Sequence, residues 1–169
     1  MIEQLKLTLP LEGEMAEVGV WQGRSAVLIH VNAPKKILHL YDTFKGIVMS
    51  DPSIDKHGNG DFANTSVEKV KGLVGEEGDL IKYHVGTFPY TFTEHNSKFC
   101  FVHSDTDTYF GAKATLDMFS PRIVEGGKIC FHDYKWVACP GIEKAISEFL
   151  KGNQNLETSL TNTWFTITF

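Results

Sequence analysis

Two short apolar runs, each followed at once by acidic residues, constrain the fold of this chain more than any other feature. Residues 99–103 (FCFVH) lead into Ser104-Asp105-Thr106-Asp107, and residues 126–131 (GGKICF) lead into His132-Asp133-Tyr134. Apolar runs of this length, flanked by glycine and aromatic residues, are typical of strands buried on both faces. Residues 109–119 between them have helical spacing, so the region predicts a strand–helix–strand unit.

The polar residues that follow these two runs predict a site. In an open parallel sheet the ligand crevice lies at the carboxyl ends of the strands, so we expect Asp105, Asp107, His132 and Asp133 to converge there. One such acid would be ordinary turn chemistry, since Asp often ends a strand. Four ionisable groups on two strand tips indicate a functional crevice.

The rest of the chain alternates between strand and helix patterns. Strands are expected at residues 15–20, 36–41 and 80–85, helices at residues 23–31, after a capping box at residues 65–68 and from Pro140, and a hairpin at residues 156–169. We therefore predict a single α/β domain over residues 1–169, with a doubly wound, Rossmann-like, mostly parallel sheet and a C-terminal antiparallel hairpin. The long polar stretch at residues 45–62 is expected to be either functional or disordered.

Composition excludes several classes of function. The net charge is −5 and the lysines are scattered, so no basic surface for nucleic acid is expected. No apolar run is long enough to span a membrane, and the first residues do not open a signal peptide, so we expect a cytoplasmic protein. Cys100, Cys130 and Cys139 lack zinc or redox spacing and are expected to be reduced and structural. Self-association into a homo-oligomer is left open.

A glycine-containing loop after the first predicted strand points to a nucleoside. The strand ends in the sequence EVGVWQGRS, residues 17–25, and a helix follows. Gly19 permits a tight turn, Gly23 permits close contact between helix and strand, and the helix N-terminus offers free N–H groups. Asp42 ends the second strand, 23 residues after Gly19, where its carboxylate can accept both ribose hydroxyls.

The side chains of this loop favour S-adenosylmethionine over a dinucleotide. A dinucleotide needs its pyrophosphate close to the backbone at the second glycine of the motif, where this chain has the bulky Trp21. The negative charge of Glu17 also disfavours a phosphate. S-adenosylmethionine has no phosphate, its amino group could be held by Glu17 or Asp105, and its carboxylate suits the loop amides.

Several motifs together resemble one known family. They are EVGVWQGRS at residues 17–25, YDTFKG at 41–46, GDFA at 60–63, GTF at 86–88, SDTDTY at 104–109 and HDY at 132–134. Their order and spacing over roughly residues 15–150 resemble the macrocin O-methyltransferase (TylF-like) family. The resemblance implies a class I, S-adenosylmethionine-dependent and metal-dependent O-methyltransferase. Its small-molecule acceptor would offer a sugar hydroxyl of an antibiotic or a related natural product.

The resemblance also implies roles for individual residues. Asp107 would be the general base, and Asp105, His132 and Asp133 would be the metal ligands. Asp42 would bind the ribose, and Gly86, Thr87 and Phe88 would lie near the adenine. The full set of expected cofactor-binding residues is Glu17, Gly19, Gly23, Ser25, Asp42, Thr43, Phe44, Gly86, Thr87, Phe88 and Asp105.

The chain departs from the family pattern in two places. The family usually has two acids where this chain has His132-Asp133. All-oxygen sites suit magnesium, whereas an imidazole shifts the preference toward manganese, iron or zinc, so magnesium or manganese is expected. Family members usually carry an N-terminal helical segment that helps to form a lid. Only residues 1–14 precede the first motif, so we expect that segment to be short or missing.

Two alternatives remain beside the methyltransferase. One is an NAD(P)-linked Rossmann oxidoreductase, which Trp21 and the final hairpin disfavour. The other is a methyltransferase-fold protein that binds cofactor without turnover, which the short N-terminal segment suggests. His57 could contact substrate or be solvated. No partner or role is expected for five other histidines: His30, His39, His84, His95 and His103.

Overall fold

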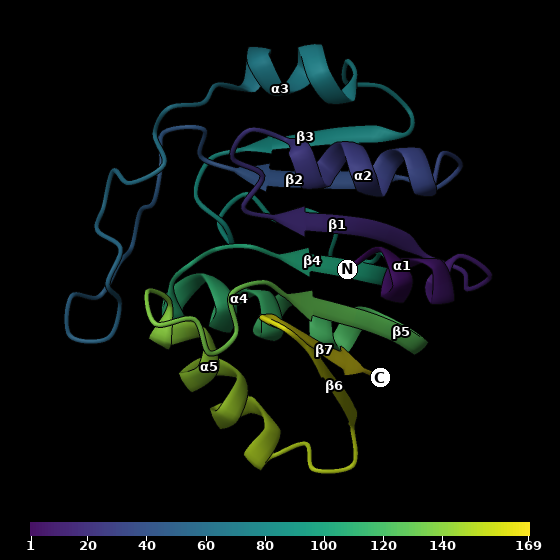
Figure 1. Ribbon diagram of the computed structural model, residues 1–169. Coiled ribbons are helices and arrows are strands. Elements are labelled where there is room, and N and C mark those ends of the chain that lie inside the picture. Colours follow the sequence, from purple (N-terminus) through teal and green to yellow (C-terminus); the bar gives the residue numbers. More distant parts are fainter.

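A seven-stranded sheet runs through the whole molecule (Figure 1). The computed structural model describes residues 1–169. The strands are β1 (Glu14–Val18), β2 (Leu38–Asp42), β3 (Ile81–Val85), β4 (Phe99–Ser104), β5 (Ile123–Phe131), β6 (Glu157–Thr161) and β7 (Trp164–Thr168). Their order is β3-β2-β1-β4-β5-β7-β6; β1 to β5 are parallel, and β7 is antiparallel to both of its neighbours. The predicted fold class, including the C-terminal hairpin, is confirmed.

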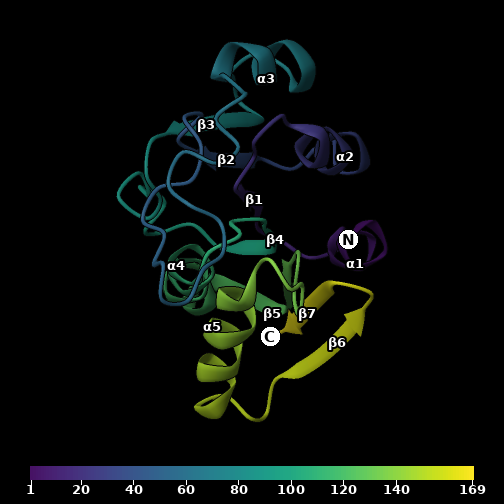
Figure 2. The same ribbon diagram turned by 60° about the vertical axis from the view of Figure 1, so that its left-hand side comes forward.

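Helices cover both faces of the sheet (Figure 2). One side carries α1 (Ile2–Thr8), α2 (Arg24–Asn32) and α3 (Val67–Val74), and the other carries α4 (Tyr109–Phe119) and α5 (Pro140–Lys151). A 3₁₀ turn, η1 (Ser120–Arg122), follows α4. Each helical layer packs on its own core cluster, and all six residues of β4 are buried between them. This two-sided burial explains why the sequence of β4 is a continuous apolar run.

One helix was missed, and the start of β5 differs from expectation by three residues. α1 was not expected; it is a short helix whose Leu5 is fully buried against the sheet, so tertiary packing stabilises it rather than its own length. β5 begins at Ile123 rather than at Gly126. Gly126 has φ +76° and lies inside the strand, where the register with β4 shifts between Phe99 and Phe101, so this glycine marks an irregularity in the strand and not its start.

The N-terminus of α3 uses a different cap from the expected one. Ser66, not Thr65, is the N-cap, and its hydroxyl accepts a hydrogen bond from the Lys69 N–H at 3.3 Å. The Thr65 hydroxyl donates instead to the carbonyl of Trp21 and so ties the start of α3 to the glycine loop. None of the five α-helices is both long and apolar enough to cross a membrane. All three cysteines are free.

Candidate active site

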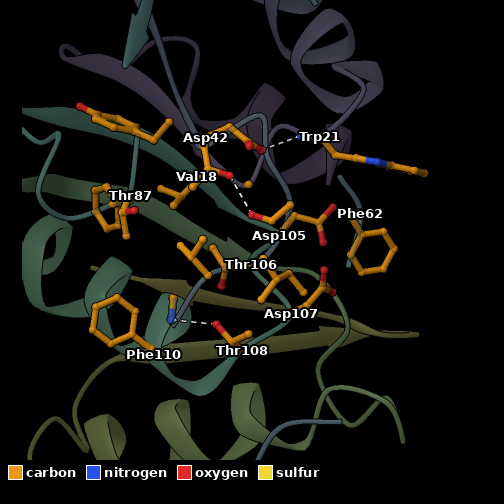
Figure 3. A pocket seen from close by; sticks show the side chains of 18 of the residues that line it. Val18, Trp21, Asp42, Phe62, Thr87, Asp105, Thr106, Asp107, Thr108 and Phe110 are labelled. Atoms are coloured by element: carbon orange, nitrogen blue, oxygen red, sulfur yellow. Dashed lines mark hydrogen bonds between the residues drawn. The ribbon is translucent and has the colours of Figure 1, made fainter. Parts of the chain in front are cut away.

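A cavity of about 270 Å³ opens at the carboxyl ends of the central strands, where the sequence predicts a crevice. Figure 3 shows Asp42 and Trp21 on one side of it, Thr108 and Phe110 on the other, and Asp105 between them. Its lining includes most of the expected site residues: Gly19, Asp42, Thr43, Gly86, Thr87, Phe88, Asp105, Asp107, His132 and Asp133. Topology therefore brings residues that are more than a hundred positions apart to one place.

Gly19 forms a close backbone contact between two strand tips. It has φ +85°, and a Cβ atom built on it would lie 2.0 Å from the carbonyl oxygen of Asp105. The Asp105 N–H also donates to the Val18 carbonyl at 2.8 Å. Only glycine fits between these segments, because a side chain would collide with backbone that cannot move alone.

Gly23 has a different neighbour from the one expected. It is the N-cap of α2 with φ +80°, and a Cβ atom there would lie 2.9 Å from Cγ1 of Val70 on α3. The close approach is therefore between two helices, not between a helix and a strand.

The Asp42 carboxylate organises the glycine loop. One oxygen accepts the N–H groups of Val20 and Trp21, both at 2.7 Å, and the other accepts the N–H of Phe44 at 2.6 Å. A carboxylate has about four lone-pair positions, so roughly one remains for a ligand. Asp42 can therefore accept about one hydrogen bond from a ligand, fewer than the two from ribose hydroxyls that the sequence predicts.

Trp21 lies at the mouth of the cavity and is not a core residue. Its side chain is 39% exposed, and its ring packs edge-on against Phe62 at a centroid distance of 5.6 Å. The indole N–H donates to the side-chain oxygen of Asn64 at 2.8 Å. These contacts fix one aromatic wall of the cavity to residues 43–66, the segment between β2 and α3.

Four expected cofactor-binding residues lie outside the cavity lining: Glu17, Gly23, Ser25 and Phe44. Glu17 is fully buried and pairs with His103 Nδ1 at 2.8 Å. Burial raises the pKa of Glu17, and the His103 pairing opposes that rise. The side chain of Phe44 packs in the core on the α2 and α3 side of the sheet, and only its N–H serves the loop through Asp42. Glu17 is therefore not placed to hold an amino group in the cavity.

Asp105, His132 and Asp133 form a compact cluster of possible metal ligands. His132 Nδ1 lies 3.2 Å from Asp105 Oδ1 and 2.9 Å from Asp133 Oδ2. One donor atom from each residue lies within 4.8 Å of the others. The Nδ1 atom is buried but makes no well-directed hydrogen bond to either carboxylate. A buried ring nitrogen that faces two carboxylates without a directed bond fits a divalent cation held by one nitrogen and two oxygens.

Charge is unevenly distributed around this cluster. Burial disfavours a charged imidazole, but the two carboxylates outweigh it and raise the pKa of His132 to about 10, so a cation that binds Nδ1 would displace the ring proton. Burial also acts against an ionised Asp105, yet His132 and His103 hold the pKa of this carboxyl below its usual value. The ring of Trp164 meets His132 edge-on at 4.3 Å and fixes its orientation from β7.

Asp107 has the properties of a proton acceptor. Burial, together with the charges of Asp105 and Asp133, raises its pKa to about 7. The Cys139 thiol donates a hydrogen bond to its Oδ1 atom at 3.4 Å. A carboxyl group with a pKa near neutrality can both take and release a proton, which suits general base catalysis.

Residues 43–66 form a long loop in front of the sheet beside α4 (Figure 2), and several of them line the cavity. Asp55 within this segment is only 5% exposed, and its carboxylate accepts the N–H of Tyr109, at the start of α4, at 2.8 Å. Gly46, Ile47 and Val48 of the same segment line the cavity. The segment therefore forms a cover, whereas α1 does not contribute to the lining.

Sequence reasoning missed several cavity residues and two histidine pairings. Thr106, Thr108 and Phe110 line the cavity, and Thr106 Oγ1 is buried without a hydrogen-bond partner. The sequence could have indicated these three residues, because they lie at or close to Asp105 and Asp107 along the chain. The expectation of no partner was wrong for His103, which pairs with Glu17, and for His39 and His84, which contact each other on β2 and β3.

Comparison with known proteins gives a family and a fold. The model of the family described as macrocin-O-methyltransferase (TylF) matches residues 6–169. A search of curated proteins found no match in sequence. The calicheamicin methyltransferase CalS11 superposes with a TM-score of 0.81 at 20% identity, covering 99% of this chain and 77% of that one. The O-methyltransferase NovP superposes with a TM-score of 0.77 at 19% identity, covering 99% of this chain and 78% of that one. The S-adenosylhomocysteine-bound methyltransferase PaMTH1 of Podospora anserina superposes with a TM-score of 0.62 at 15% identity, covering 99% of this chain and 76% of that one.

Proposed function

Since the chain belongs to the macrocin O-methyltransferase family, we propose that it methylates a hydroxyl of a sugar or another small polyhydroxylated natural product. The family is one of S-adenosylmethionine-dependent O-methyltransferases. Membership therefore favours this activity over a nicotinamide-linked oxidoreductase, and the turnover assay below distinguishes it from a protein that binds cofactor without turnover.

One observation carries the proposal. A single cavity joins the Gly19 loop, the carboxyl group of Asp107, and the cluster of Asp105, His132 and Asp133. A methyl donor, a base and an acceptor-holding group must meet within a few ångströms for this reaction.

The cofactor would lie along the glycine loop. Gly19 and Trp21 of that loop line the cavity, and the remaining lone pair of Asp42 suits one ribose hydroxyl. Gly86, Thr87 and Phe88 line the cavity and would border the adenine. Glu17 is left out of this assignment because it is buried against His103.

The residues around His132 fit a divalent ion. Asp105, His132 and Asp133 would hold it, and when bound it would lower the pKa of the acceptor hydroxyl. Asp107 would accept the hydroxyl proton while the acceptor oxygen attacks the methyl carbon. The new bond is O–CH₃, the broken bond is S⁺–CH₃, and its electron pair stays on sulfur to give S-adenosylhomocysteine.

Two features favour a sugar as the acceptor. CalS11 is also described as a TDP-rhamnose 3′-O-methyltransferase, and its apo structure superposes with a TM-score of 0.71. In this chain Trp21 and Phe62 line the mouth of the cavity. Aromatic rings are suitable surfaces for the apolar C–H faces of a sugar ring. Cytoplasmic location and self-association stay predictions.

A methyl-transfer assay tests the proposal. The chain would be incubated with S-adenosylmethionine carrying a labelled methyl group and a panel of free sugars, nucleotide-linked sugars and catechols. We expect label in a sugar derivative, and we expect calorimetry to detect S-adenosylmethionine but not NAD. Absence of S-adenosylmethionine binding would overturn the cofactor assignment, and labelling of catechols alone would overturn the acceptor assignment.

A further inference from the structure

A second cluster of possible metal ligands lies away from the cavity, at the β3 edge of the sheet. His39 on β2, His84 on β3 and Glu94 in the segment after β3 offer one ligand atom each, all within 4.8 Å of one another. The three side chains are only 6%, 13% and 12% exposed. None of them lines the cavity. This cluster therefore has no place in the methyl-transfer chemistry described above.

The spacing of the three ligand atoms matches a tetrahedral zinc ion. His39 Nδ1 lies 3.0 Å from His84 Nε2 and 3.8 Å from Glu94 Oε1, and His84 Nε2 lies 3.5 Å from the same oxygen. Zinc bonds of about 2.0–2.1 Å in tetrahedral geometry place neighbouring ligand atoms roughly 3.3–3.4 Å apart. The observed separations bracket this value, so small side-chain movements would close the site around an ion.

Two further residues support the ligands in the way that metal sites require. Glu14 Oε2 lies 2.9 Å from His39 Nε2, so that nitrogen can donate to the carboxylate and leave Nδ1 free for an ion. The Tyr41 hydroxyl donates to the other oxygen of Glu94, and Oε1 accepts the Thr93 hydroxyl at 2.7 Å while it faces the two imidazoles. The Tyr41 ring also stacks on His84 at a centroid distance of 4.2 Å and holds it in place.

We propose that His39, His84 and Glu94 form a second metal site, selective for zinc, that joins β2 and β3 to the segment following Gly86, Thr87 and Phe88. Two imidazoles and one carboxylate form a zinc ligand set in which water takes the fourth position, as in catalytic zinc sites. Because the three ligands are nearly buried and lie outside the cavity, the ion proposed here would brace the fold and not take part in methyl transfer. It would brace the segment whose first residues line the cofactor cavity, at residues 86–88, from outside the cavity.

Zinc binding is tested in a chain from which the first cluster has been removed. The double variant Asp105→Asn/Asp133→Asn would be stripped with chelator and dialysed against limiting zinc, and the bound metal would be measured by elemental analysis. We expect one zinc ion per chain. We expect it to be lost when His84→Gln is added and retained when His95→Gln is added, since His95 is exposed and outside the cluster. No zinc in the double variant, or equal zinc with and without His84, would overturn the proposal.

Two further measurements cover the case in which His84→Gln fails to fold. Glu94→Gln removes the charged ligand and replaces it with a side chain of the same shape, and it should lose the zinc as well. Cobalt added to the double variant should give the intense visible bands of a tetrahedral ion, and zinc should raise its melting temperature. Weak octahedral cobalt bands, or an unchanged melting temperature, would indicate a hydrogen-bonded histidine pair without a metal.

Discussion

The Asp55 carboxylate accepts a hydrogen bond from the Tyr109 N–H at 2.8 Å and so fastens residues 43–66 to the first residue of α4. The second Asp55 oxygen accepts the Asp51 N–H at 3.0 Å within the same segment. A Cβ atom at Gly141, the second residue of α5, would lie 2.3 Å from Asp55 Oδ1. One buried carboxylate thus joins the cover of the cavity to both helices on that face of the sheet.

Replacement of Asp55 by Ala is expected to loosen this cover. It leaves the Tyr109 N–H without its partner, which costs about 1–3 kcal/mol when the group stays buried. Hydrogen exchange should accelerate within residues 43–66, and the melting temperature should fall. Gly141→Ala should reproduce this effect by steric displacement, and Asp79→Ala at an exposed position should not. Unchanged exchange in the Asp55 variant would show that the segment is held by other contacts.

Replacement of Gly19 by Ala should abolish cofactor binding and strongly destabilise the fold. The new methyl group would collide with the Asp105 carbonyl, which it would approach to 2.0 Å. Gly60→Ala is the matched control, because Gly60 also has a positive φ, +94°, but nothing lies within 4 Å of its Cβ position. Calorimetry and thermal unfolding of both variants separate the steric effect from backbone strain. Equal losses in the two variants would contradict the contact.

Replacement of Asp42 by Asn should weaken S-adenosylmethionine binding roughly 10- to 100-fold, as expected when hydrogen bonds to a charged group are lost. In either orientation of the amide, its NH₂ group faces at least one backbone N–H donor, because both carboxylate oxygens accept from the backbone. Titration calorimetry measures the change, with Asp79→Asn as an exposed control. Wild-type affinity in the Asp42 variant would exclude its proposed part in the cofactor site.

Replacement of Asp107 by Asn should reduce turnover by about 10²–10⁴-fold, because an amide cannot accept the hydroxyl proton. Cofactor affinity should stay nearly unchanged. Asp117→Asn, at an exposed position of the adjoining helix α4, should retain full turnover. Single-turnover assays with the labelled methyl donor provide the measurement. A fully active Asp107 variant would transfer the base role to another group, with His132 as the first candidate.

Mild chelation that leaves the zinc at His39, His84 and Glu94 in place should abolish turnover and spare cofactor binding, because the ion at Asp105, His132 and Asp133 is proposed to hold the acceptor hydroxyl. Manganese should restore activity at least as well as magnesium, given the imidazole ligand. His132→Asp should shift the preference toward magnesium. Full turnover by a chain shown by elemental analysis to be free of metal would remove the metal-assisted step.

The fold was predictable because its signals are local. Buried parallel strands give continuous apolar runs, as in β4, and the helix from Pro140 shows its buried face in Ile142, Ala145 and Ile146. α1 was missed because its stability comes from the packing of Leu5 on the sheet. The start of β5 was misplaced because Gly126 and Gly127 resemble a turn, whereas they lie within the strand.

The candidate site was predictable in outline but not in its pairings. Strand-tip positions were enough to bring Asp105, Asp107, His132 and Asp133 together. They gave no information on which hydrogen bonds a side chain makes with distant residues. Glu17 was expected in the cavity, but its pairing with His103 depends on strand register between β1 and β4. Asp55, His39 and His84 also acquire their partners only through tertiary structure.

The backbone contact between Gly19 and Asp105 has a thermodynamic consequence. The first residue belongs to the proposed cofactor loop and the second is a proposed metal ligand, with no side chain between them to absorb a displacement. A displacement of one position is therefore transmitted to the other, and any coupling between the two binding events is reciprocal. The factor by which the ion changes the affinity for S-adenosylmethionine equals the factor by which S-adenosylmethionine changes the affinity for the ion.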